Sequence, residues 1–290
     1  MNPISEGNAE NGGATRQLLP FNAAIAGVVG FGLGYLYVGR LKMSFLPIVS
    51  FFSLMLIVGA TRAITVPIGV YLAYAAMLVV WLISIIHPAV IARREKDAET
   101  NSYNRGWVYL TWIIVVGLFI SQVASYRGFL FGFEAYSIPS ISMAPTLEKG
   151  DWIVADTWIY DDSAPAFGDL IVHGSPSDES IMYVKRLVGL PGDTIELRNN
   201  VLVRNGTSIE ERFIQLNNST RTHLTDFPPA TVPAGHYFVL GDNRHNSMDS
   251  RFFGSVPKEM IIGRVEYRWF AYGDGVKWGR FPDVLAIDGS

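Results

Sequence analysis

The chain has 290 residues, which is enough for two domains or for a membrane region followed by one domain. Charged residues make up 17% of the sequence, below the roughly 25% of soluble proteins, so the composition favours a membrane protein. A net charge of −3 without a basic stripe argues against nucleic-acid binding, and the absence of cysteine excludes disulfides, thiolate metal sites and cysteine catalysis.

Residues 1–17 are rich in Asn, Gly and Glu, a composition that predicts a disordered tail. Four uncharged stretches follow, at residues 17–38, 43–61, 63–86 and 107–125. Each is close to the roughly 20 residues of helix that cross a bilayer. The last two are predicted to span. The first contains four glycines and is predicted either to span or to form a tightly packed re-entrant segment.

Residues 18–106 are therefore predicted to be a membrane region with two or three helices and a cytoplasmic loop at 87–106. A further transmembrane helix is predicted at 107–126, before an extracytoplasmic domain at 127–290. None of the four uncharged stretches contains a carboxylate or a histidine, which argues against an ion path and a transport function.

The orientation is predicted from the basic residues in the short loops. Six basic residues follow the first and third stretches: Arg40, Lys42, Arg93, Arg94, Lys96 and Arg105. The opposite ends carry Arg16 and Arg62. With the richer loops in the cytoplasm, the N-terminus is predicted outside if the first stretch spans and inside if it does not. In both cases the chain after about residue 126 is extracytoplasmic.

Short apolar runs separated by turn residues characterise the chain from residue 150 onward. Strands are predicted at residues 151–155, 170–172, 182–188, 194–197, 201–203, 237–240 and 261–270. Asn205-Gly206 is predicted to be a hairpin turn. The pattern predicts an all-β domain, either a sandwich or a barrel. Residues 214–229 are expected to form a polar surface excursion, and the apolar residues 129–133 either pack in the core or lie in the lipid interface.

Two serines lie in a stiff loop between Pro139 and Pro145, because each proline fixes φ and removes a backbone donor. These serines, Ser140 and Ser142, could act in catalysis only with a base nearby. Lys185 is a candidate base because it interrupts an apolar alternation, where a lysine is costly unless it has a function.

Four segments carry a resemblance to a known family: residues 139–147, 168–172, 183–193 and 241–254. In this order after a membrane helix, they resemble the boxes of bacterial type I signal peptidases (leader peptidases), over roughly residues 107–280. The resemblance implies a membrane-bound serine endopeptidase that removes signal peptides from exported preproteins after Ala-x-Ala-like ends. It also implies the bacterial inner membrane, with the lipid bilayer and the export machinery as partners. No cofactor is expected, and no metal, since histidines and carboxylates do not cluster at ligand spacing.

The same resemblance implies a role for individual residues. Ser142 matches the nucleophile and Lys185 the general base of a serine–lysine dyad. Ser140 and the backbone N–H of Ser142 match the oxyanion donors, and Ser247 matches the serine that orients the lysine. The pairs Asp242–Arg186 and Asp249–Arg251 match residues that brace the site. The substrate strand would add beside residues 183–185. The residues expected to line the substrate pocket are Tyr136, Ile138, Met143, Leu147, Tyr183 and Val184.

Two features depart from the family pattern. His245 stands where an aspartate is usual, and it is interpreted as a solvated loop histidine. The N-terminal region also has more helices than the one or two anchors that relatives usually have.

Two other functions remain as alternatives. One is a self-cleaving regulatory serine–lysine protease, which the four apolar stretches disfavour. The other is a non-catalytic membrane scaffold or transporter subunit with a degenerate peptidase domain, which Ser142, Lys185 and Ser247 together disfavour.

Overall fold

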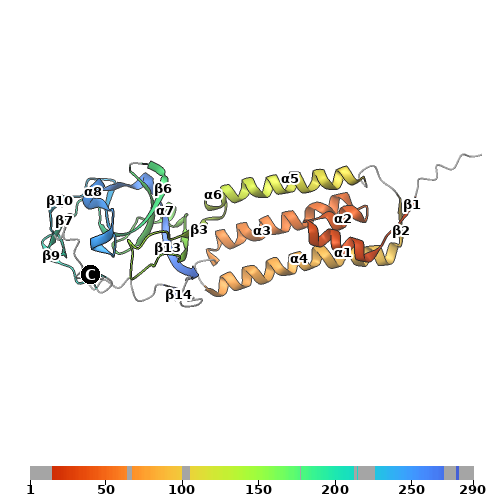
Figure 1. The fold of residues 1–290 in the computed structure, drawn as a ribbon, viewed down its shortest axis with the longest axis horizontal. Helices are drawn as coiled ribbons and strands as arrows, with labels where there is room; N and C mark the ends of the chain where they lie inside the picture. The colour runs from red at the N-terminus through yellow and green to blue at the C-terminus, as the bar shows by residue number, and fades with distance from the viewer. Residues whose placement is uncertain are drawn as a thin grey trace, which may run out of the picture. The chain divides into compact units, whose positions relative to one another are not determined.

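The computed structural model describes residues 15–63, 67–99, 105–176, 178–211, 214, 226–270 and 279–280 (Figure 1). The chain divides into two compact units. The first comprises residues up to Thr61 together with Ile68–Tyr126, and the second comprises Arg62–Pro67 and the chain from Arg127 onward. Residues 1–14 of the predicted tail and most of the predicted excursion at 214–229 lie outside the described residues.

Three long apolar helices form the first unit: α3 (Leu46–Ala60, preceded by the 3₁₀ turn η1, Leu41–Phe45), α4 (Pro67–Glu95) and α5 (Gly106–Ser125). Each of the three segments is long and apolar enough to cross a membrane. Figure 1 shows the three helices running side by side. Their side chains are largely exposed within this unit, as expected of helices that lipid surrounds. The stretches predicted at 43–61, 63–86 and 107–125 therefore form helices of membrane-spanning length.

Helix α4 is longer than the sequence pattern predicts, because it continues through Pro88 to Glu95. Residues 87–95, predicted to begin a loop, are therefore helical. A proline inside a membrane helix is tolerated when neighbouring groups satisfy the freed backbone. His87 lies one residue before it, and the His87 Nδ1 atom is hydrogen-bonded to the Tyr35 hydroxyl at 2.9 Å.

The first apolar stretch does not form one long helix. It forms α1 (Pro20–Val29) and α2 (Leu33–Tyr37), and ten residues of helix cover only about 15 Å, half of a bilayer core. Strand β1 (Thr15–Gln17) before it pairs with β2 (Asp97–Glu99), which follows α4. After it, Arg40 forms an ion pair with Glu95 at 2.5 Å. Both ends of the stretch thus lie at the C-terminal end of α4, so α1 and α2 form a helical hairpin.

Close backbone approaches hold the hairpin in the helical unit. A Cβ atom at Gly27 would lie 2.7 Å from the Ser84 carbonyl oxygen, and one at Gly32 would lie 1.9 Å from the Ser44 carbonyl oxygen. At the tip, the Phe31 carbonyl accepts a hydrogen bond of 2.9 Å from Trp112 Nε1 on α5. This bond satisfies a backbone oxygen that has no helical partner, as an apolar environment requires.

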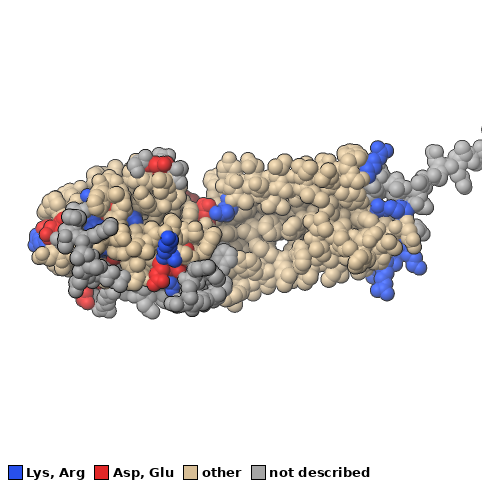
Figure 2. All heavy atoms as spheres, viewed as in Figure 1, with Lys and Arg blue, Asp and Glu red and all other residues tan. Residues whose placement is uncertain are grey.

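The basic residues of the helical unit lie together at one end. Figure 2 shows the blue side chains of this unit where α4 ends and α5 begins, and tan atoms along the rest of the helices. Arg93 and Arg94 lie in the last turn of α4, and Arg40 lies beside Glu95. Because α1 and α2 return to their starting end, Arg16 lies at this end too, where it stacks on the Tyr37 ring at 4.5 Å.

The second unit is built on an antiparallel sheet of eight strands in the order β12-β11-β6-β5-β13-β4-β3, with β14 paired to β13. Its strands are β3 (Phe133–Ser137), β4 (Trp152–Asp156), β5 (Leu170–Ser175), β6 (Asp178–Gly189), β11 (His236–Leu240), β12 (Val256–Pro257), β13 (Ile261–Phe270) and β14 (Gly279–Arg280). The short helices around it are α6 (Arg127–Phe131), α7 (Ile159–Asp162), α8 (Ser250–Phe253), η3 (Arg244–Asn246) and η4 (Lys258–Met260).

A smaller antiparallel sheet packs on the large one. Its order is β10-β7-β8-β9, with β7 at Thr194–Arg198, β8 at Val201–Arg204, β9 at Thr207–Ser208 and β10 at Phe227–Thr231. Asn205 and Gly206 both have positive φ, 52° and 82°, and form the predicted two-residue hairpin turn. Ile195 and Leu202 of this sheet share a buried cluster with Val188 and Phe238 of the large sheet. All seven predicted strands are present, so the all-β prediction for this domain is confirmed.

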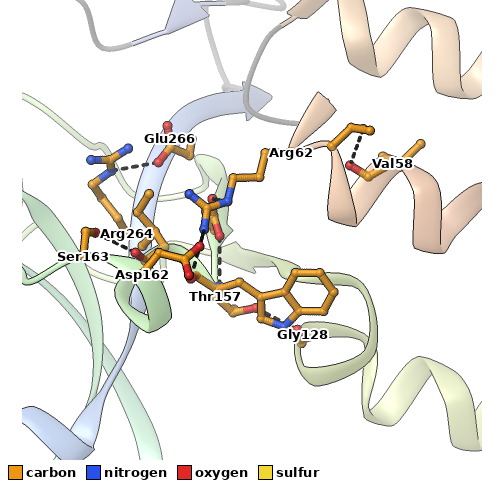
Figure 3. A network of polar contacts seen from close by, with 12 residues as sticks. Val58, Arg62, Gly128, Thr157, Asp162, Ser163, Arg264 and Glu266 are labelled. Carbon is orange, nitrogen blue, oxygen red and sulfur yellow. Dashed lines mark hydrogen bonds and ion pairs between the residues drawn. The ribbon is translucent and has the colours of Figure 1, made fainter.

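A polar network surrounds the end of β4 in the large sheet (Figure 3). Arg62, which belongs to the second unit, donates 2.8 Å from Nη2 to Asp162 Oδ2 and lies 3.6 Å from the buried Asp156 carboxylate. Beside them, Arg264 donates to Glu266 at 2.8 Å. The Arg62 guanidinium thus compensates the buried carboxylate of Asp156 at the end of β4.

Candidate active site

The nucleophile candidate lies in the loop that leaves β3. Hydrogen bonds from Ile138 N to Asp151 O and from Gly150 N to Ile138 O, both 2.8 Å, attach the two ends of the loop to each other. Between them the Ser142 side chain is half-buried and the Ser140 side chain is exposed. Their hydroxyl oxygens are 3.2 Å apart. The loop therefore presents two neighbouring hydroxyls from a backbone that is fixed at both ends.

Lys185 lies on β6, opposite Ile171 of β5. Its side chain is 2% exposed, and Nζ is 2.8 Å from Ser142 Oγ. The Tyr183 ring lies beside it, with its centroid 5.4 Å from Nζ. A central strand holds the lysine backbone and the fixed loop holds the serine, so the two reactive atoms face each other without a mobile segment between them.

Burial lowers the pKa of Lys185 from 10.5 to about 8. Removal from water disfavours the ammonium form, and the nearby Arg251 adds a smaller effect in the same direction. The carboxylates of Asp249 and Asp242 oppose both effects. The result is an amine that loses its proton far more readily than an exposed lysine does, as a general base requires.

Two buried ion pairs lie close to Lys185. Asp242 receives two hydrogen bonds from Arg186, at 2.8 Å and 2.7 Å, and a third from Thr146 at 2.5 Å. Asp249 receives two from Arg251, both at 2.8 Å, and accepts a bond of 3.0 Å from Gly241 N. Both arginine–aspartate pairs expected from the sequence are therefore present, with bidentate geometry and nearly complete burial.

The expected hydrogen bond between Ser247 and Lys185 is absent. Ser247 Oγ is buried, and among the described residues it has no hydrogen-bond partner. The hydroxyl lies instead against Gly241, where an added Cβ would be 2.2 Å from Ser247 Oγ and 2.6 Å from the Ser142 carbonyl oxygen. Glycine is thus required at position 241 because the strand end, Ser247 and the nucleophile meet there.

A cavity of about 350 Å³ opens beside the dyad. Five of the six residues expected in the pocket line it: Tyr136, Ile138, Met143, Tyr183 and Val184. Leu147 does not. It is fully buried in the core beneath the loop, together with Ile153 and Leu170. The remaining lining residues are Ser137, Pro139, Ser140, Ser142, Val172, Ile181, Met182, Lys185, Asn246 and Met248.

Three residues near the dyad were not recognised in the sequence. Asn246 and Met248 flank Ser247 and line the cavity from the side of the 241–249 loop. Asn243 bonds the nucleophile loop twice, from its N–H to the Ser142 carbonyl and from Nδ2 to the Ile141 carbonyl, both at 3.1 Å. Their position inside a segment that already carried Asp242, Ser247 and Asp249 was the signal that could have identified them. His245 lies half-buried on η3 of the same loop.

Comparison with known proteins identifies the family. Residues 107–270 match the family described as "Signal peptidase, peptidase S26". Signal peptidase I of Pseudomonas aeruginosa is 31% identical over 246 residues, which cover 69% of this chain and 82% of that protein. Probable signal peptidase I-1 of Synechocystis sp. is 36% identical over 161 residues, 53% of this chain and 78% of that protein.

A third relative, signal peptidase I P of Bacillus subtilis subsp. natto, is 37% identical over 183 residues, 61% of this chain and 94% of that protein. Among solved structures, a signal peptidase I from Enterococcus faecalis is 38% identical, with 35% of this chain and 97% of that chain covered and a TM-score of 0.30. The family match spans the loop of Ser142, the strand of Lys185 and the segment 241–254. The chain therefore belongs to the signal peptidase family, peptidase S26, and is a membrane-associated peptidase that acts on preproteins bearing signal peptides.

Proposed function

We propose that this chain cleaves signal peptides with a serine–lysine dyad formed by Ser142 and Lys185. The observation that carries the proposal is the 2.8 Å separation of Lys185 Nζ and Ser142 Oγ. It is supported by the burial of the lysine and by its pKa of about 8. An exposed lysine would be protonated at neutral pH, whereas this one is available as a base in a substantial fraction of molecules.

The steps follow from the dyad geometry. Neutral Lys185 takes the proton from Ser142 as Oγ forms a bond to the scissile carbonyl carbon. The resulting ammonium returns that proton to the leaving amine when the C–N bond breaks, which leaves an ester on Ser142. Water then attacks the ester while Lys185 accepts a proton from it. When the ester C–O bond breaks, Lys185 returns this proton to Ser142 Oγ, and the signal-peptide carboxyl group is released. The carboxylates of Asp242 and Asp249 stabilise the ammonium form of Lys185 and so limit the energetic cost of protonating it.

Ser140 is proposed to stabilise the oxyanion. Its hydroxyl lies 3.2 Å from Ser142 Oγ, close to where a tetrahedral intermediate on that oxygen would form. A hydroxyl donor there, together with the Ser142 backbone N–H, would stabilise the charge that develops on the carbonyl oxygen. Asn243 supports this arrangement because it bonds the carbonyls on both sides of the Ser142 N–H.

Cleavage after small residues is proposed from the shape and composition of the cavity. Apolar side chains line its inner part, among them Ile138, Met143, Val172 and Val184. A substrate strand added beside Tyr183–Lys185 would direct alternate side chains into this volume. Apolar walls on both sides of these positions favour small side chains, so Ala-x-Ala-like ends are the expected substrates.

We place the catalytic unit on the extracytoplasmic side of a bacterial inner membrane, with three spanning helices and the α1–α2 hairpin as a re-entrant segment in the bilayer. The basic end of the helical unit supports this orientation, because cytoplasmic loops carry an excess of Lys and Arg. The lipid bilayer and the export machinery are then the expected partners, since a substrate leaves the translocation machinery at the same face.

The decisive experiment measures preprotein cleavage by purified full-length protein in detergent or proteoliposomes. Lys185→Ala and Ser142→Ala should each abolish cleavage, because nucleophile and base act as one unit. Lys258→Ala, which removes an exposed lysine of η4, is the matched control and should cleave normally. Cleavage by Lys185→Ala at the wild-type rate would refute the dyad. So would inhibition by a chelator that zinc reverses.

A further inference from the structure

One buried ion pair near the dyad has no place in the steps above. Glu211 lies between β9 and β10 of the small sheet in the chain, and its Oε1 atom accepts a bond of 2.5 Å from Arg244 Nη2. The two side chains are 2% and 1% exposed. Arg244 lies on η3, inside the segment 241–249 that carries Asp242, Ser247 and Asp249. The pair therefore connects the chain just after β9 of the small sheet to the loop that surrounds the dyad.

Arg244 is bound to that loop at several points. Its Nε donates to the Gly241 carbonyl at 3.1 Å, and its own carbonyl accepts a bond of 2.8 Å from Arg251 Nη2. Its Nη1 atom is buried and has no hydrogen-bond partner among the described residues. In the described part of the chain, Glu211 is thus the carboxylate that compensates this guanidinium, since Asp242 and Asp249 are already engaged by Arg186 and Arg251.

The residue before Arg244 contacts the nucleophile loop directly. Asn243 donates to the carbonyls of Ser142 and Ile141, each at 3.1 Å. A displacement of Arg244 would move Asn243, and with it the peptide groups on both sides of Ser142. Removing one partner of a buried pair leaves an uncompensated charge, which drives such a displacement toward other carboxylates or water.

We propose that Glu211 is a positioning residue, which acts through Arg244 and Asn243 to hold Ser142 in line with Lys185. It touches neither substrate nor reacting atoms. The inference rests on the proposed dyad function and assigns the chain next to the small sheet a role in catalysis. Loss of the Glu211–Arg244 pair is expected to lower kcat, because a misplacement of about 1 Å in an active site can lower the rate about 100-fold.

The test compares Glu211→Gln and Glu211→Ala in the full-length protein, with kcat and KM measured for preprotein cleavage and scaled to the folded fraction. Gln keeps an acceptor for Arg244 and is expected to lower kcat about tenfold. Ala removes the acceptor and is expected to lower kcat up to about 100-fold. KM should change less than about twofold, because the lining of the cavity is formed by other residues.

A pH profile separates positioning from a direct effect on the base. The charges that act on Lys185 are Asp249, Asp242 and Arg251. The Glu211 variants should therefore keep the wild-type apparent pKa in kcat/KM while the plateau falls. A shifted pKa with an unchanged plateau would overturn the proposal, as would a kcat per folded molecule equal to that of the wild type.

Asp193→Asn is the matched control, because Asp193 also pairs with an arginine, Arg204, at 2.7 Å. Its carboxylate accepts further hydrogen bonds from Leu190 N and Asn205, and among the described residues none comes from the 241–249 loop. It should lower stability and leave kcat per folded molecule unchanged. If Asp193→Asn lowered kcat as much as Glu211→Gln does, the loss would reflect a general loss of order, and the positioning role of Glu211 would be refuted. Failure of the wild-type protein to cleave any preprotein would instead refute the proposed function.

Discussion

At Lys185, burial and charge act on one ammonium group in opposite directions. Removal from water lowers the pKa and is the larger effect, while the carboxylates of Asp249 and Asp242 raise it. Without these carboxylates, burial would make the ammonium too costly to form during the reaction. With them, the lysine can exist in both states near neutral pH, which a group that takes and returns a proton must do.

The balance at Lys185 predicts the pH dependence of cleavage. Because the neutral amine is the active form in the proposed mechanism, kcat/KM should rise with pH and level off above an apparent pKa of about 8. The same depression from 10.5 means that the folded state binds the proton less tightly than the unfolded state, so burial of Lys185 costs increasing stability as pH falls from 10.5 toward 8. Initial rates from pH 5 to 10 test the first statement. Full activity at pH 6 would contradict it.

Ser140 gives a second prediction at this scale. If its hydroxyl donates to the oxyanion, Ser140→Ala should lower turnover by about 10²–10³, roughly 3–4 kcal/mol, and leave substrate binding almost unchanged. Ser140→Thr should keep much of the activity, because the hydroxyl remains and the side chain is exposed. Turnover is measured against the folded fraction. An unaltered turnover number in Ser140→Ala would leave the serine with a local backbone role only.

At the scale of elements, the strands were easier to predict than the membrane segments. Alternating apolar residues and turns such as Asn205-Gly206 act locally, and the hairpin from β8 to β9 formed where they indicated. The end of α4 was misjudged because Pro88 and the charges that follow usually end an apolar helix. In the structure Pro88 is buried beside Gly34, whose added Cβ would lie 2.9 Å from the proline ring. Packing against α2, rather than propensity, extends this helix.

The helical hairpin of α1 and α2 predicts a specific sensitivity at Gly32. This residue has φ of 83°, and a Cβ there would lie 1.9 Å from the Ser44 carbonyl oxygen. Gly32→Ala should therefore destabilise the helical unit by more than about 2 kcal/mol, since both the backbone conformation and the contact oppose the methyl group. Gly117→Ala on α5 is the control, because no atom lies within 4 Å of its added Cβ. Thermal unfolding in detergent measures the difference. Equal midpoints for the two variants would contradict the packing of α2.

At the scale of the whole molecule, the orientation in the membrane can be tested with reporters. Strand β1 pairs with β2 after α4, so Thr15–Gln17 and Asp97–Glu99 lie at one end of the helical unit. The basic residues at that end predict that both lie in the cytoplasm. A reporter fused after Ser125 should lie outside, and reporters at the N-terminus or within 93–105 should lie inside. Cleavage of the 93–105 loop by a protease added to the outer face would contradict this orientation.

The sequence alone determined the class of the molecule and predicted the two residues of the proposed dyad. Apolar length is a property of the local chain, so α3, α4 and α5 could be predicted, and so could the seven strands with their period of two. Ser142 and Lys185 were recognisable because a serine between two prolines and a lysine in an apolar strand are unusual, and because the four segments resemble a family.

Only the tertiary structure decided how these parts meet. The first apolar stretch returns to its own side because β1 pairs with β2 and Arg40 pairs with Glu95, contacts between segments far apart in the chain. Leu147 is in the core rather than the cavity, and Ser247 contacts Gly241 rather than Lys185, because small rotations of a loop decide which atoms lie within bonding distance. The Glu211–Arg244 pair likewise joins residues 33 positions apart. Such contacts depend on backbone positions set by the whole sheet, which no local pattern encodes.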